Sequence, residues 1–271
     1  MTDSIEGGWV NRGSSLVIGR VGKPLKDYPN IFEIYKTLVS KRAIFAVINV
    51  DNDNGNSYRC VFDNPDFDVE SVKSTNARKS LRRGLSRNVI KILESDYLLE
   101  HGFKVYSSAV TRFSNYKPMT EGEFKNKISL DSQREGFRAY GAFSDDCLSA
   151  FMIVIEMDEI VFGDVAYFDP MYKNSYPMWG LYFTVARDSV SERKFAEFDR
   201  GSKPLVHETN IDDFLLKIGF TLKPCDTVAI GIFPFSSILL LLDLIVKKLP
   251  YFKHKNFQNK VSALARLIRE K

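Results

Sequence analysis

The feature that most constrains the fold of this chain is a series of three apolar segments at residues 136–144, 147–157 and 159–169. A pair of aspartates separates the first two segments, and one aspartate separates the last two. Short polar breaks between strand-like runs are typical of antiparallel hairpins. The sequence therefore predicts a three-stranded antiparallel meander over residues 136–169.

Helices and strands are expected on both sides of this meander. From residue 89 the expected elements are a strand (89–93), two helices (95–102 and 120–133), the meander, a long helix (175–193), a strand (194–199), a helix (210–219) and a final strand or hairpin (220–233). Ser95 and Gly102 are the expected N-cap and stop signal of the first helix.

The first 88 residues predict a smaller set of elements. Residues 1–28 contain five glycines and are expected to be irregular. The expected elements after them are a helix (31–41), a hairpin (42–63) with its turn in the sequence DNDNGN, and a short amphipathic helix with a basic face (76–88).

The composition is that of a folded protein, with 44% hydrophobic and 27% charged residues in 271. Cys60, Cys147 and Cys225 are odd in number and far apart, and no pair has metal-ligand spacing. Without a secretory signal at the start, a reducing, cytoplasmic location is expected. Three scattered histidines give a metal site little support, and none is predicted.

The positive charge is concentrated at the C-terminus. The net charge is +4, and residues 242–271 contain eight Lys/Arg and two acids, which sum to +6. A solvated basic surface is the expected role, and peripheral contact with the inner face of an acidic membrane is the alternative. Nucleic-acid binding is not expected, because no aromatic residues are interleaved with a basic sheet face.

The apolar stretch 228–246 precedes this basic tail. Its 19 residues contain one charge, which is the lower limit for a membrane span. Pro234, Ser236, Ser237 and Asp243 argue against a span. We expect a final strand followed by an apolar helix, with the amphipathic helix after it packed on the core or on a second subunit.

The stretch EFDRGSKPLVHETNIDDFLLKIGF, residues 197–220, has the highest density of polar groups that predict a site. His207 is the candidate general base, since an unshifted imidazole titrates near neutral pH, and Glu208 or Asp199 are candidates to orient or replace it. Ser202 and Asn210 are candidates to bond an anionic or carbonyl group, and Arg200 to pair with a carboxylate or phosphate. Surface turn, capping and ion-pair roles are the alternatives for each of these residues.

Other candidates lie outside this stretch. Arg112 is a candidate substrate-binding residue, because a charge at the end of an apolar run needs a partner. Trp179 and Tyr182 are candidates to line an acceptor pocket, although aromatic residues at these spacings are commonly core residues. Lys173, Arg82 and Arg83 are candidates to hold a phosphate-bearing donor; a solvated helix face is the alternative.

The order of elements and several motifs resemble the GNAT acyltransferase superfamily and its Fem-like branch, which includes peptidoglycan bridge-forming aminoacyl transferases and relatives from polysaccharide loci. The motifs are FAEFDRGSKPL followed by FLLKIGF, LRRGL, and YGAFSDDCLSAFMIVI. The resemblance covers about residues 76–235. It implies an α/β (α+β) fold with a mixed, mostly antiparallel sheet flanked by helices. The implied divisions are a reduced N-terminal lobe with the basic helix (1–88), an acyltransferase core (89–235) and C-terminal helices (236–271).

The chain departs from this family at one cofactor motif. Coenzyme A-dependent members place a glycine-rich loop before the helix that follows the fourth strand, whereas the corresponding PMYKNSYPM here has no glycine. Acyl-coenzyme A or another activated acyl donor is therefore expected as a co-substrate and not as a bound cofactor. The long helical arm of the peptidoglycan enzymes is also absent from the sequence pattern.

Two functions follow as hypotheses. The first is N-acyl or aminoacyl transfer to an amine of a sugar or peptide, as in surface polysaccharide or cell-wall synthesis. The second is a GNAT-fold binding or assembly protein without catalysis. The density of polar groups in residues 197–220 favours the first, and the missing glycine loop favours the second. The oligomeric state is not predicted.

Overall fold

Two compact units make up the chain, and each combines segments that are distant in the sequence. The computed structural model describes residues 9–14, 16–111, 118–203, 211–248 and 255–269. Unit 1 comprises Met1–Arg59, Gly201–Thr209 and Leu222–Lys271, and unit 2 comprises Cys60–Arg200 and Asn210–Thr221. This division differs from the expected boundaries, because the C-terminal helices belong with the first strands and the basic helix belongs with the meander.

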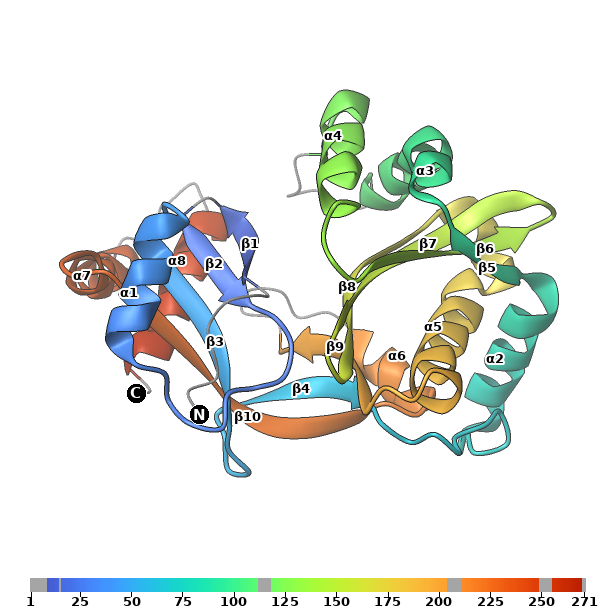
Figure 1. Cartoon of the computed structure of the whole chain (residues 1–271), viewed down its shortest axis with the longest axis horizontal. Helices are drawn as coiled ribbons and strands as arrows, with labels where there is room; N and C mark the ends of the chain where they lie inside the picture. Colours follow the sequence, from blue (N-terminus) through green and yellow to red (C-terminus); the bar gives the residue numbers. More distant parts are fainter. Residues whose placement is uncertain (1–8, 15, 112–117, 204–210, 249–254, 270–271) are drawn as a thin grey trace. The chain divides into compact units, whose positions relative to one another are not determined.

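Unit 2 contains the predicted meander and most of the helices (Figure 1). Its elements are α2 (Thr75–Arg87), β5 (Val89–Leu93), α3 (Ser95–Val110), α4 (Glu121–Asp131), β6 (Phe137–Ser144), β7 (Cys147–Met157), β8 (Ile160–Phe168), the 3-10 helix η1 (Pro170–Ser175), α5 (Pro177–Arg187), the π-helix η2 (Asp188–Glu192), β9 (Glu197–Ser202, up to Arg200) and α6 (Ile211–Lys217). The end of β4 (Ser57–Phe62, from Cys60) also belongs to this unit, and its strands follow the order β4-β9-β8-β7-β6-β5.

The meander prediction is confirmed. Strands β6 and β7 are antiparallel, as are β7 and β8, and β5 adds an antiparallel strand beside β6. Asp145 and Asp146 have φ angles of 50° and 59° in the first turn, and Asp158 has a φ of 43° in the second. Aspartate tolerates this left-handed region better than most residues, which explains why single or paired aspartates are sufficient to reverse the chain.

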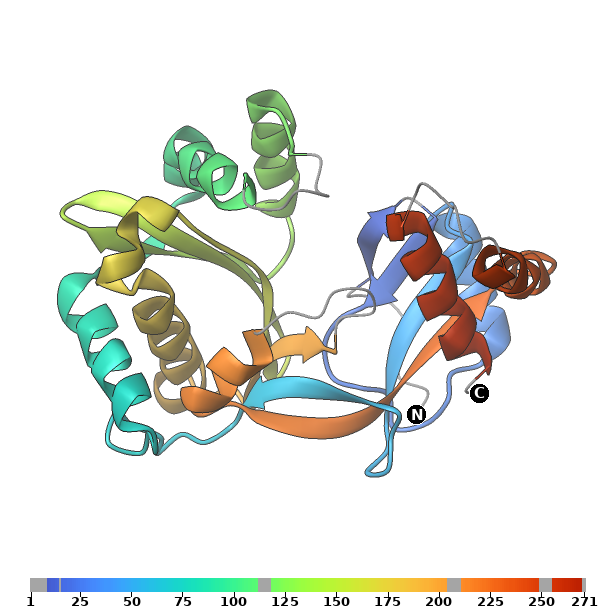
Figure 2. The same ribbon diagram turned by 180° about the vertical axis from the view of Figure 1, so that it is seen from behind.

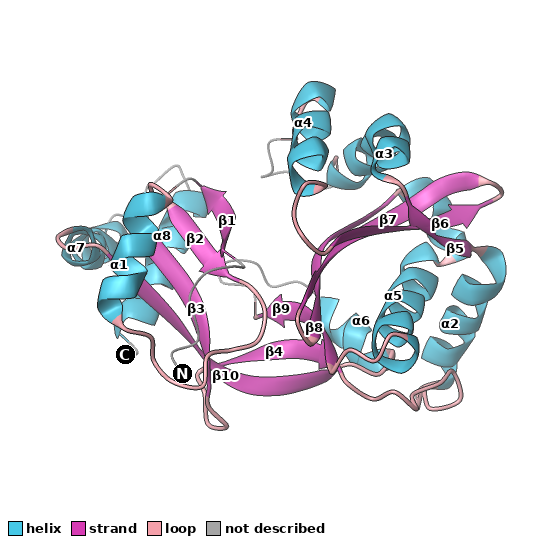
Figure 3. Ribbon diagram, viewed as in Figure 1, coloured by secondary structure: helices cyan, strands magenta, loops and turns pink. Residues whose placement is uncertain are grey.

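Helices cover both faces of this part of the sheet (Figures 1 and 3). Leu181, Tyr182 and Val185 of α5 pack on one face in a cluster that includes Met152 and Val161. Side chains of α3 and α4, among them Leu98, Tyr106 and Phe124, pack on the other face in a second cluster. The buried apolar area on the two faces supplies the main stabilisation of unit 2.

The predicted end of the first helix at Gly102 is wrong. Helix α3 continues to Val110, and Gly102 lies buried within it. A Cβ atom at this position would lie 2.7 Å from Leu98 Cδ1 and 3.1 Å from Phe124 Cζ. Glycine is therefore present to allow close packing on α4, and not to end the helix.

A network of charged and hydroxyl groups joins β6, β7 and the segment after α5. Arg138 Nε donates to Glu156 Oε1 at 2.5 Å, and Arg193 contacts Glu156 Oε2 at 2.6 Å. The Tyr140 hydroxyl donates to Asp188 Oδ2 at 2.9 Å, and burial with this carboxylate raises the pKa of Tyr140 to about 12. The network satisfies its polar groups internally, as expected of a structural element.

Glu156 predicts a pH dependence of stability. Burial raises the pKa of Glu156, but the hydrogen bonds and charges of Arg193 and Arg138 together lower it. A lowered folded-state pKa stabilises the fold above the unfolded-state value, and this contribution is lost as the pH falls through the folded-state value. We expect Glu156→Gln to reduce the free energy of unfolding at pH 7, and the difference from wild type to shrink below about pH 4, the ordinary range of glutamate. Urea denaturation at pH 7 and below about pH 4 measures this difference in the free energy of unfolding. An equal difference at the two pH values would contradict a lowered pKa of Glu156 in the folded protein.

Unit 1 has three layers, with one helix on one face of its strands and two on the other. Its elements are β1 (Trp9–Ser14), β2 (Val17–Arg20), α1 (Ile31–Ser40), β3 (Phe45–Asp51), the first residues of β4 (Ser57–Phe62), most of β10 (Thr221–Gly231), α7 (Phe235–Lys248) and α8 (Lys255–Arg269). Ile34 and Leu38 of α1 pack against Ala46 and Ile48. Figure 2 shows α8 and α7 on the side of the strands opposite α1, where Val261 and Ala265 of α8 contact Phe45 and Leu239.

Two predictions for this region are wrong. Residues 42–63 do not form a hairpin, because β10 pairs with β3 from Cys225–Asp51 to Gly231–Phe45 and lies between β3 and β4 in the strand order. The segment 1–28 is not irregular throughout its described residues, since it contains the antiparallel pair β1 and β2. The expected strand and apolar helix over 228–246 are confirmed as β10 and α7, and α8 packs on the core as expected.

In the described part of the chain, no helix is both long enough and apolar enough to cross a membrane.

Candidate active site

Strands β8 and β9 separate within unit 2, and some of the predicted site residues lie at the point where they separate. The two strands are parallel and pair at Ile160–Glu197, Val161–Phe198 and Phe162–Asp199. Beyond this point β8 continues beside β7 as far as Phe168, with a shift in register near Gly163. We call the position after Phe162 and Asp199 the β8–β9 fork. Backbone groups that leave a ladder are free to bond side chains or ligands.

Arg200 is the first residue of β9 beyond the paired segment, and its side chain bonds two elements at the fork. Its Nε donates to the Tyr182 hydroxyl at 2.7 Å, and its NH1 donates to the Gly163 carbonyl at 3.4 Å. The absence of a side chain at Gly163 leaves room for this arrangement, because a Cβ there would lie 3.4 Å from Arg200 Cδ and 3.0 Å from Phe198 Cζ. Arginine suits this position since its guanidinium can keep these bonds while offering further N–H donors.

The surroundings of Arg200 keep it charged. Tyr182 raises the pKa of Arg200 despite the opposing effect of burial, and Asp164 and Cys60 raise it further. The guanidinium is therefore a fixed positive charge at the fork. A fixed cation of this kind is suited to an anionic group or to a carbonyl that becomes negative during acyl transfer.

Three aromatic rings from α5 and α6 contact one another in sequence, and one of them, Tyr182, bonds this cation. Trp179 and Phe214 make an edge contact with their ring centroids 5.0 Å apart, and Tyr182 and Phe214 make another at 5.7 Å. Tyr182 is fully buried in the core cluster, whereas Trp179 is half-buried at its margin. The two interpretations of Tyr182 thus both apply: its ring is a core residue, and its hydroxyl orients Arg200.

Asp199 is buried at 1% exposure and pairs with Phe162 at the end of the ladder. Burial raises the pKa of Cys60 to about 12, with smaller contributions from Asp212 and Asp199 that Arg200 partly opposes. At neutral pH the thiol is protonated, so Cys60 is not a candidate nucleophile.

The burial of the three cysteines predicts how fast each thiol reacts in the folded protein. Cys147 is exposed, whereas Cys60 and Cys225 are buried. We expect one thiol to react quickly with Ellman's reagent in the folded protein, and all three after denaturation, because a buried protonated thiol is a poor nucleophile. Cys147→Ser should remove the fast phase; a fast phase that persists in this variant would place Cys60 or Cys225 at the surface.

The structure does not bring every predicted residue to the fork. Ser202 lies in unit 1, where its hydroxyl accepts from Asn49 Nδ2 at 2.5 Å, and Thr227 Oγ1 donates to Asn49 Oδ1 at 3.0 Å. The predictions for His207, Glu208, Asn210 and Arg112 fall outside the described residues. Among the described candidates, Asp199, Arg200 and Tyr182 lie at the fork, whereas Trp179 is linked to Tyr182 only through the Phe214 ring.

Three groups near the β8–β9 fork were not predicted from the sequence. These are the Gly163 carbonyl, the Cys60 thiol and the Phe214 ring. An isolated glycine inside a strand pattern is a signal for a bulge or a close approach, and Gly163 carried that signal. Cys60 and Phe214 had no local sign of their role, because their neighbours at the fork come from other elements.

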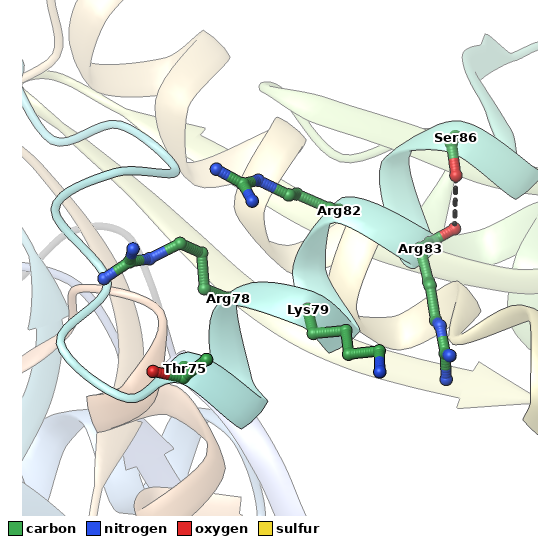
Figure 4. A pocket seen from close by; sticks show the side chains of 6 residues that line it. All are labelled: Thr75, Arg78, Lys79, Arg82, Arg83 and Ser86. Carbon is green, nitrogen blue, oxygen red and sulfur yellow. Dashed lines mark hydrogen bonds between the residues drawn. The ribbon is translucent and has the colours of Figure 1, made fainter.

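A second group of predicted residues lies on the exposed side of α2 (Figure 4). A hollow of about 420 Å³ is lined by Thr75, Arg78, Lys79, Arg82, Arg83 and Ser86, which we call the basic surface of α2. Arg82 pairs with Glu70, and Arg78 donates to the Val72 carbonyl from Nε at 3.1 Å and from NH2 at 2.9 Å. In Figure 4 the side chains of Lys79 and Arg83 extend to a different side from those of Arg78 and Arg82. Lys79 and Arg83 are therefore the better candidates for a phosphate.

The segment before α5 holds Lys173 in the exposed helix η1. At the start of α5, the Trp179 and Gly180 amides donate to the Tyr176 carbonyl at 3.0 and 3.4 Å, and Pro177 has no N–H. Tyr176 itself has a φ of 56° and caps the helix without a side-chain bond. The first turn therefore offers fewer backbone donors to a pyrophosphate than a glycine-rich loop does, as the sequence predicted.

Comparison with known proteins supports the fold. No protein-family model and no curated protein matches the chain. A crystal structure of the C-terminal domain (DUF2156) of a putative lysylphosphatidylglycerol synthetase from Agrobacterium fabrum is similar, with a TM-score of 0.56, 14% identity, and 88% of this chain and 83% of that chain covered.

Two further structures have comparable scores. L-PGS from Bacillus licheniformis has a TM-score of 0.52 at 11% identity, over 96% of this chain and 84% of that chain. FemX has a TM-score of 0.52 at 9% identity, over 79% and 81%. The expected fold, a large, mostly antiparallel sheet flanked by helices, is confirmed, and it is similar to the fold of these three structures. Assignment to the Fem-like branch stays a prediction, because the similar structures do not single that branch out.

Proposed function

We propose that this protein transfers an acyl or aminoacyl group from an activated donor to an amine, at the β8–β9 fork. The main support for this proposal is the position of Arg200. Its charged side chain donates to the Tyr182 hydroxyl and to the Gly163 carbonyl where the two parallel strands separate. The GNAT-like fold and the printed descriptions of the similar structures, a putative lysylphosphatidylglycerol synthetase and FemX, agree with transfer chemistry.

Transfer to an amine requires a base, a donor for the oxyanion and a means of holding the leaving group. Arg200 supplies fixed N–H donors and positive charge for the carbonyl oxygen as it gains negative charge. Asp199 is next to it, and His207 is the candidate base that accepts the amine proton. Lys79, Arg83 and Lys173 are the candidates for a phosphate of the donor.

The acceptor class follows from the sequence resemblance and is part of the proposal. It is an amine of a sugar or peptide, as in surface polysaccharide or cell-wall synthesis. Phe214 packs on the Tyr182 ring and Trp179 packs on Phe214, and these two rings are the candidates for an apolar surface that such an acceptor contacts.

A transfer assay tests the proposal. The protein is mixed with acetyl-coenzyme A or an aminoacyl-tRNA together with amino sugars and lysine-containing peptides, and acylated products are counted by mass spectrometry. We expect transfer from one donor class, reduced about 100-fold or more in Arg200→Met, which is the scale for losing one oxyanion donor. Arg187→Met, which changes an exposed arginine on α5, is the matched control. Equal rates in the two variants would exclude Arg200 from the reaction.

Binding without catalysis is the second candidate function. It is favoured by the start of α5, where Pro177 and the bonds to the Tyr176 carbonyl leave few backbone N–H groups for a coenzyme A pyrophosphate. A donor that binds and raises the melting temperature but is never consumed, with wild-type protein and all acceptors present, would support this function instead.

A further inference from the structure

Helix α7 of unit 1 has an exposed apolar face. Its members, which we call the α7 apolar face, are Phe233 (75% exposed), Phe235 (43%), Ile238 (45%), Leu241 (58%) and Leu242 (36%). Residues 235, 238 and 242 follow the three- and four-residue spacing of one helix face, and Phe233 lies two residues before the start of the helix. Scattered single apolar side chains are ordinary on a protein surface, but a contiguous group of this kind marks an interaction site.

The opposite side of α7 contains its only acid. Asp243 is completely buried and accepts a hydrogen bond from Ser262 Oγ of α8 at 2.6 Å. Leu239, on the same side, packs against Phe45, Val261 and Ala265. The helix therefore directs its carboxylate inward and large apolar side chains outward. A surface helix normally has the opposite arrangement, with its apolar side chains toward the core and its polar side chains toward water.

The charge of the sequence around α7 indicates what its apolar face contacts. Helix α7 ends at Lys247 and Lys248, and residues 242–271 have a net charge of +6, whereas the residues before them sum to −2. A second copy of this chain would bring the same positive charge to the same place, so that the two copies would repel each other. An anionic lipid surface offers both an apolar phase for the side chains and negative charge for the lysines.

We propose that unit 1 attaches to the surface of an anionic membrane through the α7 apolar face. Helix α7 lies in the plane of the interface, with Phe235, Ile238 and Leu241 among the acyl chains. Asp243 stays buried against Ser262, so no carboxylate enters the lipid. The attachment does not depend on the proposed transfer reaction, since the fork lies in unit 2.

Vesicle flotation with the full chain tests this proposal. We expect wild type to float with vesicles of phosphatidylcholine and phosphatidylserine, and to float poorly with phosphatidylcholine alone. The double variant Ile238→Glu, Leu241→Glu should bind the anionic vesicles at least about tenfold more weakly, because two charges replace buried apolar contact. The matched control is Leu130→Glu on α4, which changes an apolar side chain of 59% exposure in unit 2 and should bind as wild type does.

A second variant separates insertion from simple charge attraction. Phe233→Trp adds an indole at the start of the α7 apolar face, and its emission should shift to shorter wavelength on anionic vesicles. Retained binding by the double variant, or an unshifted indole on bound protein, would overturn the proposal and leave only adsorption of the basic residues. A wild-type dimer that the double variant breaks, with no vesicle binding, would assign the face to a second copy and equally overturn it. Circular dichroism melting confirms that each variant is folded.

Discussion

Replacing Gly84 by alanine should lower the free energy of unfolding by about 2–3 kcal/mol, the upper part of the range for overpacking. A Cβ atom at Gly84 would lie 2.7 Å from the Gly180 amide nitrogen and 2.8 Å from the Tyr176 carbonyl oxygen. Both neighbours are backbone atoms of α5 and its cap, so neither can rotate away. To admit one methyl group, α2 and α5 must move apart along their whole contact, which loosens the packing of Trp179 and Phe183.

Gly122→Ala is the matched control for this prediction. Gly122 lies in the first turn of α4, and a Cβ atom there would meet nothing within 4 Å. Alanine is the better helix former, so this change should be neutral or stabilise the protein by up to about 1 kcal/mol. Urea denaturation of wild type and both variants gives the comparison. Similar free energies of unfolding for the two variants would show that α2 and α5 do not approach as closely as described.

The second large effect is expected at the fork. Arg200→Met and Tyr182→Phe should each lower the free energy of unfolding by about 1–3 kcal/mol, because each leaves a buried polar partner without its hydrogen bond. The double variant should lose less than the sum of the single losses, since the 2.7 Å bond between them is removed only once. A double-mutant cycle measures this coupling, which we expect at about 1–2 kcal/mol.

Arg187→Met controls for the general effect of removing an arginine from unit 2, and it should change stability by less than about 0.5 kcal/mol because the side chain is exposed. Strictly additive losses for Arg200 and Tyr182 would mean that the two side chains do not bond each other in solution. The fork would then lack the fixed cation on which the proposed function depends.

The sequence predicted the elements whose causes are local. The meander followed from apolar runs and aspartate breaks, and the aspartates have the positive φ angles that such turns require. Helix α4 followed from Thr120, which forms a capping box with Glu123. In each case a few neighbouring residues specify the structure, so the pattern is visible in a short stretch of sequence.

Strand pairings and packing contacts whose causes are distant in the sequence were missed. Strand β10 enters between β3 and β4 although about 160 residues separate it from β4, and no local pattern records that pairing. Gly102 has the appearance of a helix stop because glycine commonly ends helices; its actual reason is the approach of Phe124 from α4.

The residues of the candidate site also include some that the sequence predicted correctly and some that it did not. Arg200 and Asp199 were identified from the density of polar groups, and Tyr182 as an aromatic candidate for an acceptor pocket; the three lie together at the fork. Ser202 is only two residues beyond Arg200, yet it bonds Asn49 in unit 1. Neighbours in sequence therefore need not share a site when a strand passes from one unit to the other.

Hydrogen–deuterium exchange of the full chain with acetyl-coenzyme A, and separately with an aminoacyl-tRNA, tests most directly whether the fork binds the acyl donor. The account predicts that one donor slows exchange in peptides covering β8 beyond Phe162 and the start of α5, and that Arg200→Met removes this protection while Arg187→Met keeps it. Protection confined to unit 1, or no protection of the fork by either donor, would contradict the account.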